Sequence, residues 1–562
     1  MFSFRILQKM KLKILLALAF CFVLINCSAT QKAVWQTAST ADQRSDQTPN
    51  QTERVDLTPE LISNARINFP QNAVALPKAI DVSTAPKDVE LNQKILDTIE
   101  QSPFKNARWG VFVTSLKDGR VLVAQDAQKL FNPASTQKVM TTAVALDRLG
   151  ADFRWRTSAL IAEGIAPDGT LRGDLILKGR GAPDFDERGI AALVAQLKAG
   201  GLRRVTGNIV GDASFFHADN LGSGWVWDEA QWYYGAEPSA LSYSDNTVLV
   251  EVAPGEKDGA PAIIKTTPAA DFVQISNQTT TQANASVQTV GVHRDLDSNN
   301  LQIWGEVPRS KTFAVRTTMH APQLWAASAL KKSLEQNGIQ VGGAATAVDW
   351  RTVSYDATSL KELAAVGSDP LAEIVKRTNK RSINLNAELM LRTVGARARE
   401  TAEKEHRIML GDDALGAMAI KNWLSERGVS AGADEIRDGS GLSRLDFVTP
   451  ETMGRLLVFA AQMKYAQEFK DSLPIAGTDG TLGGRLAKFK DKIFAKTGTV
   501  TFVNALAGYA QIADDETLAF VILCNNETSE QSSVPTIDAV TSLIAGFPNL
   551  DQSDNAATVR HK

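Results

Sequence analysis

The feature that most constrains the fold is a mostly apolar helix predicted near residues 133–149. The stretch reads "FNPASTQKVMTTAVALDRLG" from residue 131, and Asn132 and Pro133 suit the N-cap and the first helical position. Its body is apolar around much of the surface, through Val139, Met140, Ala143, Val144 and Leu146. Such a helix has to be covered by other elements. Ser135 and Lys138 would then lie on one face of the first turn of a buried helix.

Composition allows a large folded body but identifies no polymeric partner. The chain has 562 residues, of which 44% are hydrophobic and 22% charged, so it can bury a large core in more than one structural unit. Lys and Arg total 60 against 63 Asp and Glu, a net charge of -3. This balance gives no reason to expect nucleic acid as a partner. Binding must therefore depend on local sites.

The N-terminus has the pattern of an export signal. Basic residues precede "ILLALAFCFVLI", an apolar run that is short for a membrane span and well proportioned for a signal peptide. We expect a signal peptide at 1–29 and an exported protein in the periplasm or cell envelope. Cleavage after Ala29 fits the small-residue rule, and "LINC" offers lipidation of Cys27, a membrane anchor, as the alternative. Polar residues 30–89 are expected to form a flexible tether.

Cysteine and histidine usage implies no cofactor. The three cysteines are Cys21, Cys27 and Cys524, and the first two lie in or beside the signal peptide, so no intrachain disulfide framework remains. Cys524, within "LAFVILCNN", is interpreted as a buried strand residue and not as a nucleophile. No His/Cys cluster has the spacing of metal ligands, and we expect no metal. The sequence gives no indication of oligomeric state.

The predicted secondary-structure pattern changes twice along the chain. A β-hairpin is predicted around Asp118-Gly119, between two β-rich runs. Residues 158–361 contain short β-rich runs separated by many turn residues, which indicates a mostly β insertion. Helical periodicity returns in 362–548, followed by strands and a last helix. Residues 549–562 are expected to be a tail.

A serine three positions before a lysine occurs three times, so the spacing alone selects no site. Ser102 lies in an expected helix exit, and Ser328 lies within an expected helix whose Lys331 faces solvent. Only Ser135 begins a helix whose remaining turns are apolar. Burial would lower the pKa of Lys138, and a neutral lysine amine can take the proton of a serine hydroxyl. An ordinary capped helix is the alternative on this segment alone.

A Lys-Thr-Gly triplet, found once in the chain, favours the catalytic interpretation. It lies on a predicted strand that could flank the serine-headed helix. Thr497 and Thr499 are placed to bind a substrate carboxylate, and Lys496 supplies positive charge. This second cation is also expected to lower the pKa of Lys138. Gly498 would let the substrate approach the backbone closely.

A Ser-x-Asn triplet is expected as a third element between Ser135 and Lys496, and this stretch offers three. Ser244–Asn246 and Ser298–Asn300 lie in turn-rich sequence, where serine and asparagine often make local hydrogen bonds. Ser382 and Asn384 precede the helical "LNAELMLRTVG". We therefore select Ser382 and Asn384.

These motifs together resemble the low-molecular-mass class C penicillin-binding proteins, the serine-lysine D-alanyl-D-alanine carboxypeptidases and endopeptidases. The resemblance covers nearly all of residues 90–548 and includes "NPASTQK", "RSINLNAELMLR", "RDGSGLSRLDFVTP", "PIAGTDGTLGGRL" and "AKTGTV" in the family's order. The long separation of Ser135 from Ser382 matches the family's insertion after the nucleophile helix. "KGRGAPDF" departs from the Gly-Gly-Asp-Pro-like turn of many relatives.

The resemblance implies a fold. It is a serine β-lactamase/transpeptidase-like α/β domain, an antiparallel sheet flanked by helices, built from 90–157 and 362–548. The insertion at 158–361 would form two smaller domains.

The resemblance also implies roles in a reaction with peptidoglycan stem peptides. Ser135 would attack the D-Ala-D-Ala carbonyl to form an acyl-enzyme, with Lys138 as general base. Ser382 would pass a proton to the leaving amine together with Lys496, and Asn384 would orient the substrate amide. β-Lactams would inhibit by acylating the same serine.

Further site residues follow from the same resemblance. The N–H groups of Ser135 and Thr499 would form the oxyanion hole. Arg444, Asp228 and Glu229 would grip the ionised end of the peptide's side chain, with solvated surface charges as the alternative interpretation.

Three rival functions are weaker. A Ser-His-Asp hydrolase is disfavoured because the chain has only five histidines and no Gly-x-Ser-x-Gly elbow. A β-lactamase or esterase on the same fold would need a Tyr-x-Asn or a fixed deacylating glutamate, and neither is evident. A non-catalytic penicillin-binding scaffold need not keep all five of the catalytic candidates, which are Ser135, Lys138, Ser382, Asn384 and Lys496.

Overall fold

The computed structural model describes most of the chain beyond the N-terminal region: residues 76, 79–270, 273–283, 289–404, 410–430, 432–513, 516–528 and 531–549. The predicted signal peptide with Cys27, most of the tether and nearly all of the tail lie outside these residues. Among the helices within them, none is long and apolar enough to cross a membrane. The first of these helices, α2 (Pro86–Glu100), begins inside the stretch expected to be tether.

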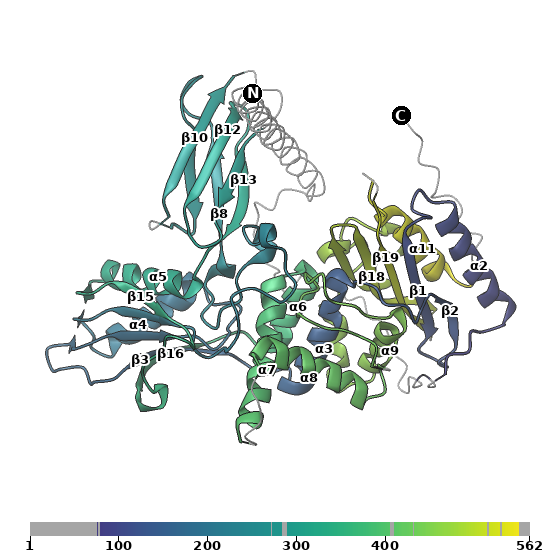
Figure 1. Cartoon of the computed structure of the whole chain (residues 1–562), viewed down its shortest axis with the longest axis horizontal. Helices are drawn as coiled ribbons and strands as arrows, with labels where there is room; N and C mark the ends of the chain where they lie inside the picture. Colours follow the sequence, from purple (N-terminus) through teal and green to yellow (C-terminus); the bar gives the residue numbers. More distant parts are fainter. Residues whose placement is uncertain are drawn as a thin grey trace, which may run out of the picture. The chain divides into compact units, whose positions relative to one another are not determined.

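A five-stranded antiparallel sheet forms the centre of the body, and its strands come from distant parts of the chain (Figure 1). The strand order is β17-β18-β19-β1-β2. Strands β1 and β2 form the predicted hairpin around Asp118-Gly119. The strand bounds are β1 (Arg108–Ser115), β2 (Val121–Gln125), β17 (Ile493–Val500), β18 (Val503–Ala513) and β19 (Glu516–Asn525). Cys524 of β19 is buried, as predicted.

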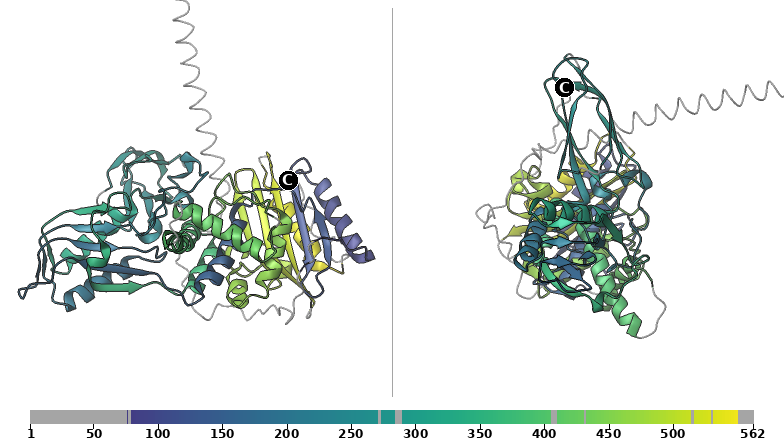
Figure 2. Two further views of the ribbon diagram at one scale, coloured as in Figure 1. Left: turned by 60° about the horizontal axis from the view of Figure 1, so that its bottom comes forward. Right: turned by 90° about the vertical axis from the view of Figure 1, so that its left-hand side faces the viewer.

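Alternate residues of these strands face two separate apolar cores, as the strand period of two requires. Val111 and Ile522 belong to one core, with side chains of α2 and α11 (Val534–Gly546). Phe112 and Val521 belong to the other core, which contains side chains of the helices α3 (Gln137–Leu149) and α9 (Pro450–Ala460). The sheet therefore lies between two helical layers (Figure 2).

The serine-bearing helix α3 is covered on several sides, as its apolar body predicts. All of its residues from Gln137 to Leu146 are buried. It contacts helices that belong to the second part of the body: α6 (Leu371–Arg381), α7 (Asn384–Lys404), α8 (Asp412–Glu426) and α10 (Ala466–Ser472).

The start of this helix differs from the prediction. A 3₁₀ turn, η2 (Ala134–Thr136), precedes α3, and Pro133 lies just before that turn instead of in the first α-helical position. Asn132 is therefore not the N-cap residue, although its Oδ1 accepts a hydrogen bond from the N–H of Ala134 at 2.9 Å. Ser135 therefore lies in the 3₁₀ turn η2, whereas Lys138 lies in the first turn of α3.

The insertion contains two groups of strands. The first is a mixed five-stranded sheet in the order β15-β7-β5-β3-β16, with a small sheet β14-β6-β4 beside it. Its strands are β3 (Arg156–Ile161), β4 (Thr170–Leu171), β5 (Leu175–Lys178), β6 (Arg204–Val205), β7 (Ile209–Asp212), β14 (Gln340–Val341), β15 (Ala345–Val348) and β16 (Lys361–Gly367). Because β16 pairs with β3, it belongs to the insertion's sheet, although we expected the insertion to end at residue 361.

This first group also contains two helices, of which the one around Ser328 was expected and the other was not. They are α4 (Glu187–Ala199) and α5 (Pro322–Gln336). The sequence signalled α4 through Asp186, whose side chain accepts hydrogen bonds from the N–H groups of Arg188 and Gly189.

The second group consists of two three-stranded sheets, β13-β8-β9 and β10-β12-β11. Its strands are β8 (Thr247–Ala253), β9 (Ile263–Thr267), β10 (Ile275–Gln282), β11 (Gly291–Arg294), β12 (Leu301–Pro308) and β13 (Phe313–Thr318). Short 3₁₀ turns occur in the loops of the chain: η3 (Trp227–Glu229), η4 (Tyr233–Gly235), η5 (Ser244–Asn246), η6 (Ala357–Ser359), η7 (Gly480–Leu482) and η8 (Ala487–Phe489).

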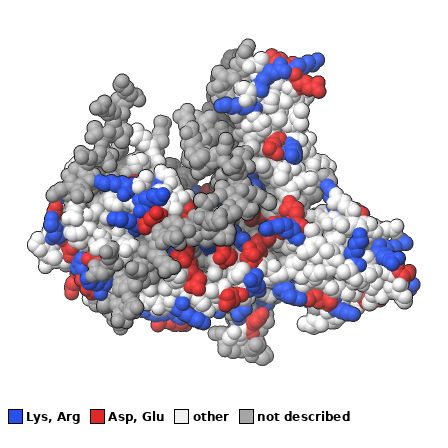
Figure 3. Space-filling view, turned by 180° about the vertical axis from the view of Figure 1, so that it is seen from behind, with Lys and Arg blue, Asp and Glu red and all other residues white. Residues whose placement is uncertain are grey.

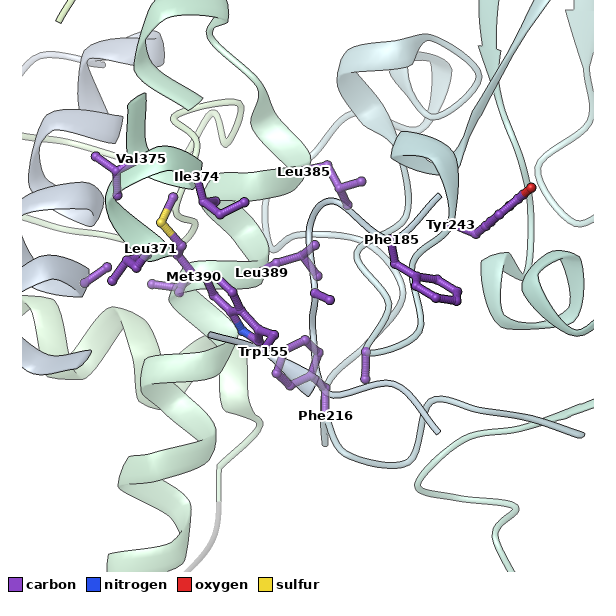
Figure 4. Close-up of a cluster of buried hydrophobic side chains, with 14 of the residues drawn as sticks. Trp155, Phe185, Phe216, Tyr243, Leu371, Ile374, Val375, Leu385, Leu389 and Met390 are labelled. Carbon is purple, nitrogen blue, oxygen red and sulfur yellow. The ribbon is translucent and has the colours of Figure 1, made fainter. Parts of the chain in front are cut away.

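Insertion and body share buried apolar side chains. Phe185, Phe216 and Tyr243 of the insertion belong to the same core cluster as Leu371 of α6 and Leu389 of α7 (Figure 4). On the outer surface, basic and acidic side chains lie interspersed over the described part of the face in Figure 3, in keeping with the small net charge.

We predict that Gly454→Ala destabilises the protein, although alanine is the better helix former by about 1 kcal/mol. A Cβ at this α9 position would lie 2.2 Å from Cδ1 of Phe112, which is fully buried between helix and sheet. Overpacking of this kind costs about 1–3 kcal/mol. Thermal unfolding measures the effect, with Gly164→Ala as the control because a Cβ there meets no atom within 4 Å. A Gly454→Ala protein as stable as the wild type would contradict the packing described.

Candidate active site

The amine of Lys138 lies at the centre of the site. Its Nζ is 2.8 Å from Ser135 Oγ, 2.6 Å from Asn384 Oδ1 and 2.7 Å from the carbonyl oxygen of Ser440. The side chain is fully buried. The structure thus brings together Ser135, Lys138 and Asn384, which are far apart in the sequence.

The geometry around this amine suits its neutral form. The Nδ2 of Asn384 donates to the carbonyl of Tyr234 at 2.9 Å, which turns Oδ1 of the same amide toward Lys138. Two fixed acceptors, Asn384 Oδ1 and the Ser440 carbonyl, can therefore take the two N–H groups of a neutral amine. The remaining lone pair then faces the hydroxyl of Ser135.

Burial lowers the pKa of Lys138 to about 7, because the charged ammonium loses its hydration. The carboxyl groups of Asp438, Glu388 and Asp446 act in the opposite direction. We expected Lys496 to be a second cause of this lowering, but it is not among the causes. Instead, burial and then the charge of Lys138 lower the pKa of Lys496 well below the ordinary lysine value.

Ser382 and Lys496 form a second pair. α6 ends at Arg381, its C-cap residue Ser382 has a left-handed φ of 56°, and α7 begins at Asn384. This sharp turn places both polar side chains at the site. The Nζ of Lys496 donates to Ser382 Oγ at 2.9 Å and to the carbonyl of Thr497 at 2.7 Å.

Strand β17 passes directly beside the serine. A Cβ at Gly498 would lie 3.1 Å from the backbone nitrogen of Ser135 and 2.9 Å from the carbonyl oxygen of Pro133, so the close approach requires glycine. β17 is an edge strand, and the N–H of Ala495 points away from β18 to the carbonyl of Pro474 at 2.9 Å. Because the pattern alternates, the N–H of Thr499 also points to the open side.

The two threonines of the "AKTGTV" strand make side-chain contacts as well. Thr497 Oγ1 lies 2.8 Å from Thr481 Oγ1, and Thr499 Oγ1 donates to Asn504 Oδ1 at 2.8 Å. Their positions border the same open side of β17.

The three residues proposed to grip the peptide's side chain behave differently from one another. Arg444 Nη2 pairs with Glu229 Oε1 at 2.9 Å, and Arg444 Nη1 donates to the carbonyl of Thr501 at 3.2 Å. Asp228 is exposed. Arg444 and Glu229 thus neutralise each other beside the end of β17, and Asp228 remains at the surface.

The rejected motifs are structural. Ser102 follows α2, and Lys331 of α5 pairs with Glu335 at 2.6 Å. Asn246 is fully buried and holds its own loop, through hydrogen bonds with Tyr243 and Glu237 backbone groups at 2.8 and 2.9 Å. In the described ranges, no group of three or more His, Cys, Asp or Glu side chains could hold a metal ion.

Sequence reasoning missed the segment that supplies the Ser440 carbonyl. It lies in "RDGSGLSR", in which the motif comparison assigned a role to Arg444 alone. Asp438, Glu388 and the backbone of Tyr234 were also missed. The glycines flanking Ser440 signal a tight turn, but a backbone acceptor has no signature in the side-chain sequence.

Comparisons with known proteins support the same interpretation. Residues 91–545 match the model of the D-Ala-D-Ala carboxypeptidase 3 (S13) family. The chain belongs to this family. A D-alanyl-D-alanine carboxypeptidase of Actinomadura sp. (strain R39) is 30% identical over 501 residues, covering 86% of this chain and 90% of the relative. The enzyme class expected from the sequence, a serine-type D-Ala-D-Ala carboxypeptidase, is confirmed.

Solved structures confirm the fold class. The crystal structure of penicillin binding protein 4 from Haemophilus influenzae superposes with a TM-score of 0.68 at 26% identity, covering 80% of this chain and 98% of that protein. The same protein complexed with a β-lactam gives a TM-score of 0.64 at 25% identity, covering 81% and 98%.

We predict that acylation of the carboxypeptidase slows as the pH falls through about 7. Below this pH Lys138 is protonated and has no lone pair for the serine proton; above it the amine is neutral. Lys138→Arg should be nearly inactive at every pH, because a guanidinium remains protonated. The acylation rate with a fluorescent penicillin, measured from pH 5 to 9, checks both. Wild-type rates in Lys138→Arg would mean that another group deprotonates Ser135.

A second prediction concerns Asn384, whose Oδ1 holds one N–H of Lys138. Asn384→Ala should slow acylation roughly ten- to a thousand-fold, the effect of losing a positioned polar contact. Asn300→Ala is the control, because it changes an exposed asparagine of a rejected Ser-x-Asn triplet. Asn246→Ala should lower stability without changing the acylation rate of the folded protein. A larger loss in Asn300→Ala than in Asn384→Ala would move the site into the insertion.

Proposed function

We propose that Ser135 is the nucleophile that cleaves the terminal D-Ala-D-Ala bond of peptidoglycan stem peptides. The observation that carries this proposal is the Lys138 amine, held by two acceptors with its third direction toward Ser135 Oγ. Lys138 takes the hydroxyl proton while the serine oxygen attacks the carbonyl carbon. The tetrahedral intermediate collapses to an acyl-enzyme, and water later hydrolyses the ester.

The leaving group needs a proton, and Ser382 is placed to supply it. Its hydroxyl accepts a hydrogen bond from Lys496, so the hydroxyl proton is free to move to the departing amine. Lys496 can then replace that proton. A D-alanine leaving group makes the reaction a carboxypeptidase step, and a cross-linking peptide as leaving group makes it an endopeptidase step.

Backbone and strand groups stabilise the charges of the substrate. The N–H groups of Ser135 and Thr499 form the oxyanion hole, supported by the close approach of β17 to the serine turn. Thr497, Gly498 and Thr499 border the place for the substrate's terminal carboxylate. Asn384 orients the substrate amide through the same side chain that holds Lys138.

The Arg444–Glu229 pair borders this site, and we propose that an ionised group of the stem peptide's side chain exchanges with it. An incoming carboxylate would replace Glu229 at Arg444, and an incoming ammonium would replace Arg444 at Glu229. Asp228, exposed next to Glu229, adds negative charge at this edge. β-Lactams acylate Ser135 in the same way as the peptide, which the β-lactam complex of the Haemophilus influenzae protein supports.

The protein acts in the cell envelope. This location follows from its peptidoglycan substrate and from the export signal predicted at residues 1–29. Attachment to the membrane through a lipid on Cys27 is the alternative to cleavage after Ala29. The catalytic parts come from the residues before β3 and after β16, on either side of the insertion.

Covalent labelling tests the proposal. A fluorescent penicillin should label the wild-type protein at Ser135, identified by mass spectrometry of the labelled peptide, and Ser135→Ala should abolish labelling. Ser102→Ala and Ser328→Ala are matched controls that should label normally, because each removes the serine of a rejected serine-lysine pair. Defined muropeptides identify the product released. Labelling that persists in Ser135→Ala would overturn the assignment.

A further inference from the structure

We propose that Asp438 is a positioning residue for Lys138, which it orients by fixing the Ser440 carbonyl against the lysine amine. The inference rests on the proposed function, in which Lys138 is the base. It assigns a role to a buried carboxylate that does not itself touch the substrate or the reacting atoms.

Five donors converge on the Asp438 carboxylate. Backbone N–H groups of Ser440, Gly441 and Ser443 donate at 3.1, 2.7 and 2.9 Å, and the Ser440 hydroxyl donates at 3.0 Å. The indole N–H of Trp225 donates at 2.8 Å. A carboxylate, which only accepts, can satisfy all of them. The turn at 438–443 is therefore wrapped around one buried acidic side chain.

This turn packs directly on the catalytic helix and the serine turn. The Thr141 hydroxyl of α3 donates to the Gly439 carbonyl at 2.7 Å, next to the Ser440 carbonyl that accepts from Lys138 at 2.7 Å. Gly441, with φ of 79°, lies so close that a Cβ would be 1.8 Å from the Ala134 carbonyl oxygen. A shift of the turn would therefore move the acceptor that orients the base.

Two further carboxyl groups support the arrangement without replacing Asp438. Glu388 of α7 accepts the N–H of Gly439 at 2.9 Å, and Asp446 accepts the N–H of Arg437 at 2.6 Å. Burial, followed by the charge of Asp438, raises the pKa of Glu388 to about 8 and that of Asp446 well above its ordinary value. Burial and the neighbouring charge of Asp438 thus disfavour the charged forms of Glu388 and Asp446, and Asp438 is the acceptor around which the donors gather.

The insertion takes part through Trp225. This residue lies in the loop that also contains Tyr234, whose carbonyl fixes the Asn384 amide. Both acceptors of the Lys138 amine therefore depend on one loop of the insertion. Tyr234 of this loop fixes Asn384 Oδ1. Trp225 of the same loop holds Asp438, which fixes the Ser440 carbonyl.

The experiment compares Asp438→Asn with the wild type in single-turnover acylation by a fluorescent penicillin, separating noncovalent affinity from the acylation rate. An asparagine places an NH₂ group against backbone donors, so the turn must shift. We expect the acylation rate to fall roughly 10- to 100-fold, as for a misplacement of about 1 Å, with unchanged noncovalent affinity. An unchanged acylation rate would overturn the proposal.

Asp434→Asn is the matched control. Asp434 is also a buried carboxylate of this region, but its partners are Thr449 N–H and Thr452 Oγ1, each at 2.9 Å, and the Ser430 hydroxyl. It should lose thermal stability and keep its acylation rate. Equal rate losses in both variants would show that general destabilisation, not positioning, is the cause.

If Asp438→Asn does not fold, Ser440→Ala tests the positioning role of Asp438 instead. It removes one donor to Asp438 and keeps the backbone carbonyl, so the acylation rate should fall several-fold; a wild-type rate would overturn the proposal. Failure of the proposed function is a distinct result, because the wild-type label would then lie on a residue other than Ser135.

Discussion

The proposed mechanism depends on keeping one amine, that of Lys138, out of water. A lysine surrounded by solvent is charged near pH 7 and cannot act as a base, whereas the fully buried Lys138 has a pKa of about 7. Burial alone would leave a polar group without partners, which is costly. The two fixed acceptors and the serine hydroxyl supply those partners, and they also set the direction of the lone pair. The same three partners of the Lys138 amine thus stabilise its burial and orient it for reaction.

The groups around the amine come from distant parts of the chain. Ser135 and Lys138 belong to the first part of the body, Asn384 and Ser440 to the second, and Tyr234 to the insertion. The central sheet has the same character, because β1 pairs with β19. Hence the site is complete only when most of the chain has folded, and few of its contacts are local.

The sequence predicted those parts of the site that use side chains in regular spacing. The serine-headed apolar helix, the Lys-Thr-Gly strand and the selected Ser-x-Asn triplet were distinguished by context, since Ser102, Ser328 and Asn246 lie in other surroundings. The 3₁₀ turn before α3 was missed, because Pro133 suits the start of either helix type. The Ser440 carbonyl was also missed, because every residue has a carbonyl and only the fold determines which one faces Lys138. The lowered pKa of Lys138 was attributed partly to Lys496, because the sequence alone does not show which charged groups lie near the amine. The fold shows that these groups are buried carboxyl groups, which raise the pKa.

The insertion begins and ends on neighbouring strands, with Arg156 at the start of β3 opposite Gly367 at the end of β16. The two ends of the insertion are therefore held together by its own strand pairing. For the body, the long insertion is equivalent to a short connection between two neighbouring points. Folding of the insertion brings its two ends together and so offsets the entropic cost of closing this long loop. That cost grows only slowly with loop length. Evolution can therefore lengthen, shorten or replace the outer sheets of the insertion while the loop at Trp225 and Tyr234 is kept, and the reaction centre need not change.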